Sequence, residues 1–503
     1  MNQPTLFAGC EPEVAAGVDG RILAVGDEAR SAAGRRAEVV RLHGAAWPGL
    51  IDAHIHLEGL AERHLNLDLT GTASLEETLA RIKSWAAELP AEAWVVGSGW
   101  YNDAWKDRSF PSRRRLDEAA GGRPAYLRRK DGHSAWVSSV ALKVAGIDRT
   151  TEDPPGGRID RDKRGEPTGI LRETAMQLVF DRVPQADEAQ LDDAMARALA
   201  ELAGLGLTAV HSMDSARGFG SWQRLRARGQ LPVRISYNLP LTDLPHAERI
   251  GARSGWGDEW IRIWGVKAFL DGSLGSRTAE MLDGSGTARL LQADLLDLVD
   301  RCARAELNLC LHAIGDGAVR RALDALARNR GTWRLWRPRI EHAQCVDPND
   351  VTRFAQIGVI ASMQPVHAVA DRRLVDQYWS QVAGHAYAWS ALARAGARLA
   401  FGSDAPVETA DPLAGIEAAT EWRRQAGWHP DLALSRAAAL RAYTVGAAYA
   451  VGMEKDLGSL RPRKLCDMTV VDADGVVATV VGGNVTFLRT PPSASPLSSP
   501  KTR

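Results

Sequence analysis

The sequence of 503 residues is poor in features that mark particular classes of protein. Cysteine is scarce and forms no C-x-x-C pair. The five cysteines are Cys10, Cys302, Cys310, Cys345 and Cys466. Their odd number and scattered positions favour reduced thiols in a cytoplasmic protein, with a single disulfide as the alternative.

Long apolar runs and an excess of one charge are also missing. No run of about 18 uninterrupted apolar residues occurs, and the first residues, MNQPTLFAGCEPEVAAG, lack the basic and apolar parts of a signal peptide. The 62 Lys+Arg balance the 62 Asp+Glu, without a basic stripe. We therefore expect neither a membrane nor a nucleic acid as partner. A small-molecule substrate remains, and a homo-oligomer is an open possibility.

What the sequence does contain is ordinary globular composition, with 45% hydrophobic and 25% charged residues. Eight short apolar or β-rich runs alternate with segments of helical pattern. These runs begin at Pro48, Gly206, Pro232, Trp260, Leu307, Pro338, Gly358 and Arg398. Eight strands alternating with helices predict an α/β fold, a distorted (β/α)₈ TIM barrel over about 47–454.

Three further segments do not fit a plain barrel. The gap over about 67–202 separates the first two strands and contains strand and helix patterns, so we expect an insertion on the barrel's C-terminal face. Alternating apolar patterns in 1–46 and 455–488 predict a small β-sandwich built from both chain ends. The Pro/Ser-rich segment 489–503 is predicted to be a disordered tail.

Six residues with side chains suited to metal binding fall at or near the ends of predicted strands. They are His54, His56, Lys267, His312, His342 and Asp404. Strand ends of a parallel barrel converge on one rim, where catalytic groups gather. Each residue alone has a simpler interpretation, since a histidine can be structural and Asp404 can cap a helix. Their shared placement nevertheless predicts a divalent metal site, suited to zinc, manganese, nickel or iron.

Lys267 needs a separate explanation, because an ammonium group beside cations would be repelled. One solution is a neutral lysine with a depressed pKa. A second is reaction with carbon dioxide to give a carbamate that bridges two metals. The third is an ordinary ion pair with Asp271, four residues later. The residues alone leave all three open.

The motifs around these residues resemble the amidohydrolase superfamily, in particular amidohydrolase family 3, which includes YtcJ-like proteins and N-substituted formamide deformylases. The stretches that carry the resemblance are PGLIDAHIHL, RRKDGHSAWV, GEPTGILRE, GVKAFLDGSLGSRTA, LHAIGDGAV, RIEHAQ, SMQPVHA and FGSDAPVE, in this order from Pro48 to Glu408. Together they are specific for the family but not for a substrate.

The resemblance implies a metal-dependent hydrolase of non-peptide C–N bonds with two metal ions, expected to be Zn²⁺. His54 and His56 would bind the first ion, His312 and His342 the second, and a carboxylated Lys267 would bridge them. Asp404 would bind the first ion and shuttle protons for a metal-activated hydroxide. An ester or lactone hydrolase with the same site is one alternative. A barrel that binds or regulates without turnover is the other.

Five further residues are candidates for substrate binding. They are His133, Trp100 and Trp136 in the insertion, His211 at the end of the second strand, and Arg277 after the fourth. His133 could equally hold the insertion closed. Tryptophan is frequent, with 16 residues, and Trp100 and Trp136 could form an apolar wall, although core packing is the simpler interpretation. His211 and Arg277 could contact substrate or brace neighbouring loops.

Overall fold

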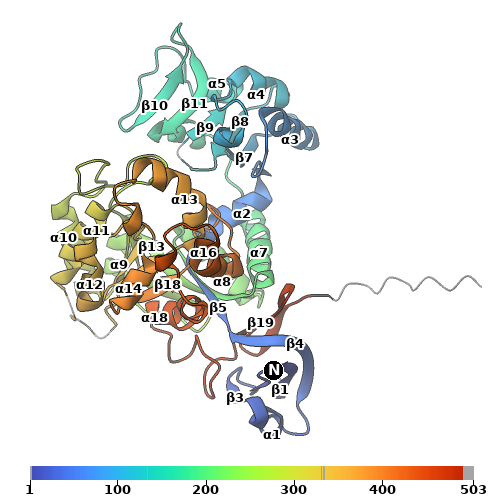
Figure 1. Ribbon diagram of the computed structural model, residues 1–503. Coiled ribbons are helices and arrows are strands. Elements are labelled where there is room, and N and C mark those ends of the chain that lie inside the picture. The colour runs from blue at the N-terminus through green and yellow to red at the C-terminus, as the bar shows by residue number, and fades with distance from the viewer. Residues whose placement is uncertain (1–2, 133, 330, 332, 334, 491–503) are drawn as a thin grey trace, which may run out of the picture.

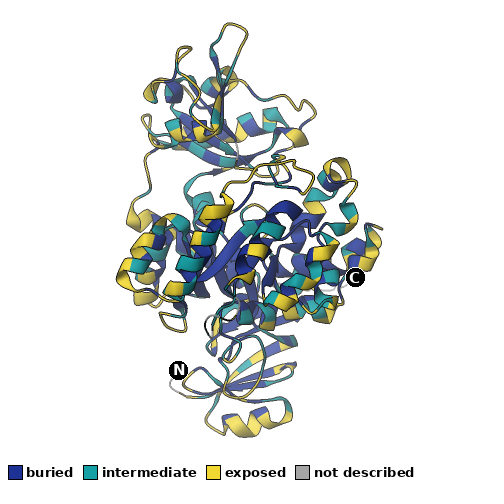
Figure 2. Cartoon of the chain, turned by 90° about the vertical axis from the view of Figure 1, so that its left-hand side faces the viewer, coloured by how far each residue is buried: buried dark blue, intermediate teal, exposed yellow. Residues whose placement is uncertain are grey.

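The computed structural model describes residues 3–490 except 133, 330, 332 and 334. It places three units one after another, with the inserted sheet at one end, the barrel in the middle and the sheet of the chain ends at the other (Figure 1). Figure 2 shows the buried strands of the barrel at the centre, surrounded by helices with exposed outer faces.

The middle unit is the predicted eight-stranded barrel, in which all strand pairs are parallel. Its strands are β5 (Leu50–Ile55), β12 (Leu207–Ser212), β13 (Arg234–Pro240), β14 (Ile261–Phe269), β15 (Asn308–Ala313), β16 (Arg339–His342), β17 (Ile360–Met363) and β18 (Arg398–Phe401). Each falls in one of the eight runs read from the sequence. The predicted fold class is therefore confirmed.

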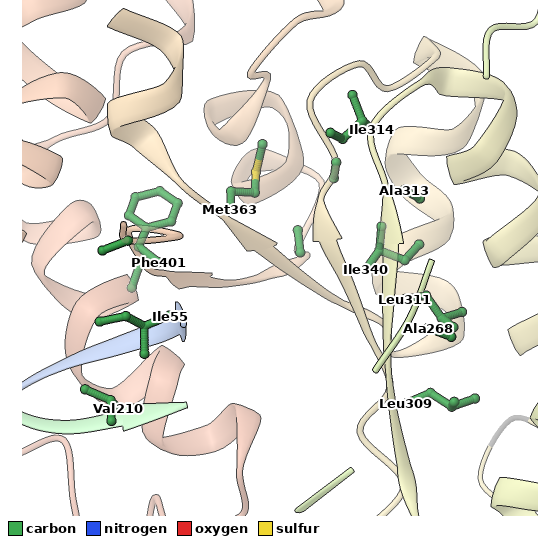
Figure 3. Packing of buried hydrophobic residues seen from close by; sticks show 14 of the residues in the cluster. Ile55, Val210, Ala268, Leu309, Leu311, Ala313, Ile314, Ile340, Met363 and Phe401 are labelled. Carbon is green, nitrogen blue, oxygen red and sulfur yellow. The ribbon is translucent and has the colours of Figure 1, made fainter. Parts of the chain in front are cut away.

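Helices surround the barrel because the strands bury apolar side chains on their outer faces. These helices include α8 (Ala216–Ala227), α9 (Leu244–Ile250), α10 (Gln292–Ala305), α11 (Asp316–Ala327), α12 (Pro348–Ile357), α13 (Pro365–Tyr378) and α14 (Trp389–Arg394). Strand residues such as Val210, Leu309, Leu311 and Ile340 belong to one buried cluster with helix residues (Figure 3). Successive strand residues point to opposite faces, so their neighbours in sequence face the barrel interior.

The first and last strands meet just beyond their ends. The Asp404 N–H donates to the His54 carbonyl at 2.7 Å, and the His56 N–H donates to the Ala405 carbonyl at 2.8 Å. The buried Asp52 carboxylate accepts from the backbone of both His54 and Ser403. These bonds fix the β5 and β18 ends against each other at the rim where the metal site is predicted.

The insertion forms a separate six-stranded sheet with helices. Its strands are β6 (Leu67–Asp68), β7 (Val95–Trp100), β8 (Ala125–Arg129), β9 (Ser134–Val137), β10 (Gly157–Arg161) and β11 (Pro167–Glu173), and its helices are α3 (Leu75–Glu88), α4 (Arg113–Ala119), α5 (Ser139–Val144) and α6 (Gln177–Phe180). The next helix, α7 (Glu188–Gly204), begins at a capping box of Asp187 and Gln190. It packs against α2 (Leu57–Leu65) and α8 as part of the barrel, although it lies inside the range expected for the insertion.

The chain ends build one seven-stranded sheet in the order β21-β20-β19-β4-β1-β2-β3. Its strands are β1 (Thr5–Glu11), β2 (Val14–Ala16), β3 (Ile22–Val25), β4 (Glu38–Pro48), β19 (Met468–Asp472), β20 (Gly475–Val481) and β21 (Asn484–Leu488). The antiparallel pair β4–β19 joins the two ends. Of the predicted tail 489–503, residues 491–503 lie outside the described residues.

The structure bears on two of the sequence-based expectations, the state of the cysteines and the lack of a membrane-spanning segment. All five cysteines are buried and free, so the alternative of a single disulfide is wrong for this structure. Within residues 3–490, apart from the four gaps, no helix is both long and apolar enough to cross a membrane.

Candidate metal centre

His54 lies near the end of β5 with its ring turned into the barrel and fully buried. Its Nδ1 lies 2.6 Å from Oε2 of Glu341. Because a carboxylate only accepts hydrogen bonds, Nδ1 carries the proton and Nε2 keeps its lone pair. Burial, assisted by Lys267, lowers the pKa of His54 to about 4, so the ring is neutral at pH 7. A neutral imidazole with a free Nε2 is a metal ligand.

Asp404 lies between His54 of β5 and His56, which directly follows that strand. Its Oδ1 lies 3.4 Å from Nε2 of His54 and 3.2 Å from Nε2 of His56. Four donors placed about 2.0–2.1 Å from a tetrahedral ion, the usual zinc–nitrogen distance, are separated by about 3.3–3.4 Å. The three side chains therefore have the spacing of ligands to one ion. Asp404 holds a positive φ of 61°, an unusual backbone state that aims its side chain at this point.

The carboxylates around His56 affect its charge. Its Nδ1 lies 3.8 Å from Oδ1 of Asp214, on the side opposite Asp404. Although burial opposes it, these two carboxylates raise the pKa of His56 to about 9. A cation that replaced the proton on Nε2 would be held by the same negative charge, so metal binding there should release a proton.

Lys267 lies on β14, and its Nζ is 3.3 Å from Nε2 of His54. Burial lowers the pKa of this amine, which favours its neutral form. Asp271 is not its partner, because the Asp271 carboxylate accepts hydrogen bonds from the backbone N–H groups of Ile314, Gly315 and Glu280. The ion-pair interpretation of Lys267 is therefore wrong. The neutral amine and the carbamate remain.

His312 and His342 form the other half of the centre, with ring centroids 4.5 Å apart. The Nε2 of His312 donates to the Gly272 carbonyl at 3.0 Å, which leaves Nδ1 buried and without a hydrogen-bond partner among the described residues. The Nδ1 of His342 donates to Oε1 of Gln364 at 2.8 Å, so its Nε2 keeps the lone pair. A buried imidazole nitrogen with no partner, such as Nδ1 of His312, is costly unless something binds it, and imidazole nitrogens of this kind are metal donors.

A buried polar network supports these ligands from inside the barrel. The guanidinium group of Arg339 is fully buried and donates to Glu341, to the Ala53 carbonyl, to Ser362 and to Nδ1 of His211. Although burial would raise it, the pKa of Glu341 is held well below its usual value by Arg339 and His54. Glu341 therefore stays ionised and fixes the orientation of His54. The contact between His211 and Arg339 favours the bracing role over a contact with substrate.

Three groups at the centre were not among the residues predicted from the sequence. Asp214 and Glu341 orient ligands, and His367 on α13 has its Nε2 3.7 Å from Oδ2 of Asp404. His342, His367 and Asp404 together also have the spacing of a metal-binding group. His367 lies in SMQPVHA, one of the motifs noted above, but it follows a strand by four residues rather than ending it. Its position within that motif was the only available signal.

Four of the predicted substrate-binding residues lie away from the six ligands or outside the described residues. Trp100 and Trp136 are fully buried in the core of the inserted sheet, where each indole donates to a backbone carbonyl, so they do not form a pocket wall. Arg277 stacks on Tyr378 and lines a second cavity of about 570 Å³ that none of the six predicted ligands lines. His133 lies outside the described residues.

A cavity of about 730 Å³ opens beside the centre, between the barrel and the inserted sheet. His56 and Asp214 line it from the barrel side, and Lys130 lines it from the insertion. Lys130 Nζ pairs with Oε1 of Glu408 at 3.0 Å, which ties the insertion to the loop after β18. The cavity is large enough for a small organic substrate and is lined by charges of both signs.

The comparisons with known proteins agree with this geometry. The sequence model of the Amidohydrolase family matches residues 38–487. The chain belongs to the amidohydrolase family. This amidohydrolase is 30% identical over 461 residues to YtcJ of Bacillus subtilis (strain 168), covering 87% of this chain and 86% of that protein. It is 28% identical over 491 residues to the N-substituted formamide deformylase of Arthrobacter pascens, covering 91% and 89%.

A solved structure adds to the comparison. A metal-dependent hydrolase of Pyrococcus furiosus, itself uncharacterized, has a TM-score of 0.74 and 27% identity, covering 94% of this chain and 98% of that one. The amidohydrolase described here is therefore a metal-dependent hydrolase of the amidohydrolase superfamily. The family resemblance read from the motifs is confirmed.

Proposed function

We propose that this amidohydrolase cleaves a non-peptide C–N bond, in an N-substituted formamide, amide or carbamate. The observation that carries the proposal is the position of Asp404. One of its carboxylate oxygens faces His54 and His56, and the other faces His367. A carboxylate in this place can take a proton from attacking water and pass it on. An amine leaves only after its nitrogen is protonated, so such a carrier matters most for C–N bonds.

Two divalent ions, in our proposal Zn²⁺, fit the donor atoms of the centre. His54, His56 and Asp404 would hold the first, and Nδ1 of His312 with Nε2 of His342 would hold the second. Imidazole nitrogen and carboxylate oxygen are donors that suit zinc. Ions of this kind, when bound, lower the pKa of water and polarise a carbonyl group.

Lys267 would link the two halves as a carbamate. Burial favours the neutral amine, whose lone pair can form an N–C bond to carbon dioxide while one N–H proton is released. The product carries a negative charge and two oxygens in place of an ammonium group. That exchange removes the repulsion that a cationic Lys267 would exert on two metal ions.

The proton transfer follows from the charge of Asp404. Although burial would raise it, the pKa of this carboxyl is held well below its usual value by His54, His56 and His342. Asp404 is therefore ionised and accepts a proton as water adds to the substrate carbonyl. It then gives that proton to the leaving nitrogen as the C–N bond breaks, which releases an amine and an acid.

A substrate panel tests the bond type. We expect the zinc-loaded protein to hydrolyse N-benzylformamide or a simple carbamate faster than the matching benzyl formate, after each rate is corrected for the uncatalysed reaction. The similarity to a deformylase makes formamides the first group to measure. Turnover of esters and lactones without any turnover of amides would reject the C–N proposal. It would leave the metal-dependent hydrolase of the superfamily intact.

A further inference from the structure

The histidines of the centre differ in what binds the nitrogen that points away from it. His54 faces the Glu341 carboxylate, His312 faces the Gly272 carbonyl and His342 faces the Gln364 side-chain oxygen. All three partners are acceptors. Each therefore fixes a proton on the distal nitrogen and leaves the inner nitrogen bare, which is the tautomer that binds a metal.

His367 has the opposite kind of partner. Its Nδ1 lies 3.2 Å from Nε2 of Gln344, the amide nitrogen, which can only donate. Nδ1 must then accept, and the proton of the neutral ring is on Nε2. This Nε2 is buried and has no hydrogen-bond partner among the described residues. A nitrogen that carries a proton cannot bind a metal, but it can donate.

The direction of this N–H is set by α13. His367 is the third residue of that helix, and its ring stacks on His342 with centroids 6.1 Å apart and planes 14° apart. Nε2 lies 3.7 Å from Oδ2 of Asp404, too far for a hydrogen bond. The N–H is thus held at the centre, beside the proposed proton carrier, without an acceptor of its own among the described residues.

We propose that His367 is a catalytic residue that donates its Nε2–H to the substrate carbonyl oxygen as that oxygen gains negative charge. This role rests on the hydrolase function proposed above. Gln344 is the positioning residue, because its amide decides which nitrogen of His367 carries the proton. No bond to His367 forms or breaks. The donor stabilises the tetrahedral oxyanion, as donors aimed at developing charge do in other hydrolytic sites.

The tautomer can be measured without any turnover. ¹⁵N-histidine spectra of the metal-free protein, compared with spectra of His367→Phe to assign the signal, should show His367 protonated on Nε2. A ring protonated on Nδ1 would mean that the Gln344 side-chain oxygen faces it instead. That result would overturn the proposal and make His367 a candidate ligand.

Metal content and kinetics provide the second test. His367→Phe keeps the ring but removes the N–H, so kcat should fall by about 10²–10³, the usual effect of losing one such donor. Metal per chain should stay at the wild-type value. Gln344→Glu replaces a donor with an acceptor-only group, so it should reverse the tautomer and lower kcat to a similar extent. His246→Phe, on α9, is the matched control and should change neither quantity.

The choice of substrates separates the role from the wider proposal. Loss of kcat on both an activated ester, p-nitrophenyl acetate, and N-benzylformamide is expected, because both reactions pass through an oxyanion. Loss of about one metal ion per chain in His367→Phe, or a kcat within about tenfold of wild type, would overturn the role. If the wild-type protein turned over neither substrate, the proposed function would fail, whereas the spectra and metal content would still decide the tautomer.

Discussion

The mouth of the barrel, meaning the metal ligands and the polar network that supports them, and the inserted sheet both bury large side chains. The buried side chains are of different kinds. At the mouth, the fully buried Arg339 and Glu341 are hydrogen-bonded to each other and to the groups around the metal ligands. In the inserted sheet, Trp100 and Trp136 are equally buried, but they belong to a cluster of apolar side chains. Burying a charge costs far more than burying an indole unless every polar atom is paired.

That difference shows how function and stability are divided in this chain. A dense network of buried, hydrogen-bonded charges inside a barrel is costly and holds ligands in one orientation. An aromatic cluster costs little desolvation free energy to bury, and it stabilises the fold. We therefore expect substitutions at the mouth to act on chemistry and metal binding, and substitutions in the inserted core to act on unfolding.

The largest effect should come from Asp404→Asn. The amide cannot accept and return a proton, so kcat/KM should fall by about 10²–10⁴, while much of the bound metal is retained because His54 and His56 remain. Steady-state kinetics and elemental analysis of the same preparation would measure both. Asp193→Asn, at an exposed position of α7, is the control. Near-normal turnover by Asp404→Asn would refute the proton-transfer role.

Trp100→Ala should lower the free energy of unfolding by about 3–5 kcal/mol, the usual cost of removing a buried large aromatic side chain. The Leu127 carbonyl would also lose its indole donor. Denaturant unfolding would measure the change. Trp256→Ala removes the same side chain from a position that is 66% exposed and should cost less than about 0.5 kcal/mol. Equal costs at the two sites would contradict the assignment of Trp100 to a core.

Glu341→Gln should weaken metal binding by about 10–100-fold, the usual effect of losing a partner that orients a ligand. The neutral amide would no longer fix the His54 proton on Nδ1 or balance the charge of Arg339. Competition with a chelator would measure the affinity. Glu76→Gln, at an exposed position of α3, is the control. An unchanged affinity for the metal in Glu341→Gln would show that His54 does not depend on this carboxylate.

The smallest effect should come from Lys130→Met, which breaks the ion pair with Glu408 between the inserted sheet and the barrel. The pair is partly exposed, so its loss should cost about 0.2–1 kcal/mol of stability. KM should change more than kcat, because Lys130 lines the cavity and does not touch the predicted ligands. A large fall in kcat with KM unchanged would place Lys130 in the chemistry instead.

The barrel and its rim could be predicted well, because strand period and strand ends are local signals. His54, His312, His342 and Asp404 lie at, just before or just after strand ends, so the strand pattern alone was enough to expect their convergence. The partners of those ligands could not be predicted, since Glu341 reaches His54 from a position 287 residues away. His367 was missed because it lies on a helix rather than at a strand end.

The number of tryptophans was a poor guide to the pocket for a related reason. A count of residues says nothing about which face of a strand they occupy. Trp100 ends β7 and Trp136 lies on β9, and both face the same apolar cluster of the inserted sheet. Only the pairing of those strands, which depends on contacts distant in sequence, places the two rings together.

Metal content per chain tests the central claim most directly. The protein would be purified without added metal, and a crystal structure would show whether Lys267 is modified, because a carbamate is lost in acid. The account predicts about two divalent ions per chain, a carbamate at Lys267 and loss of the second ion in Lys267→Ala. One ion with an unmodified Lys267 would contradict the binuclear centre. Absence of metal, even after reconstitution with zinc, would contradict the proposed hydrolase as a whole.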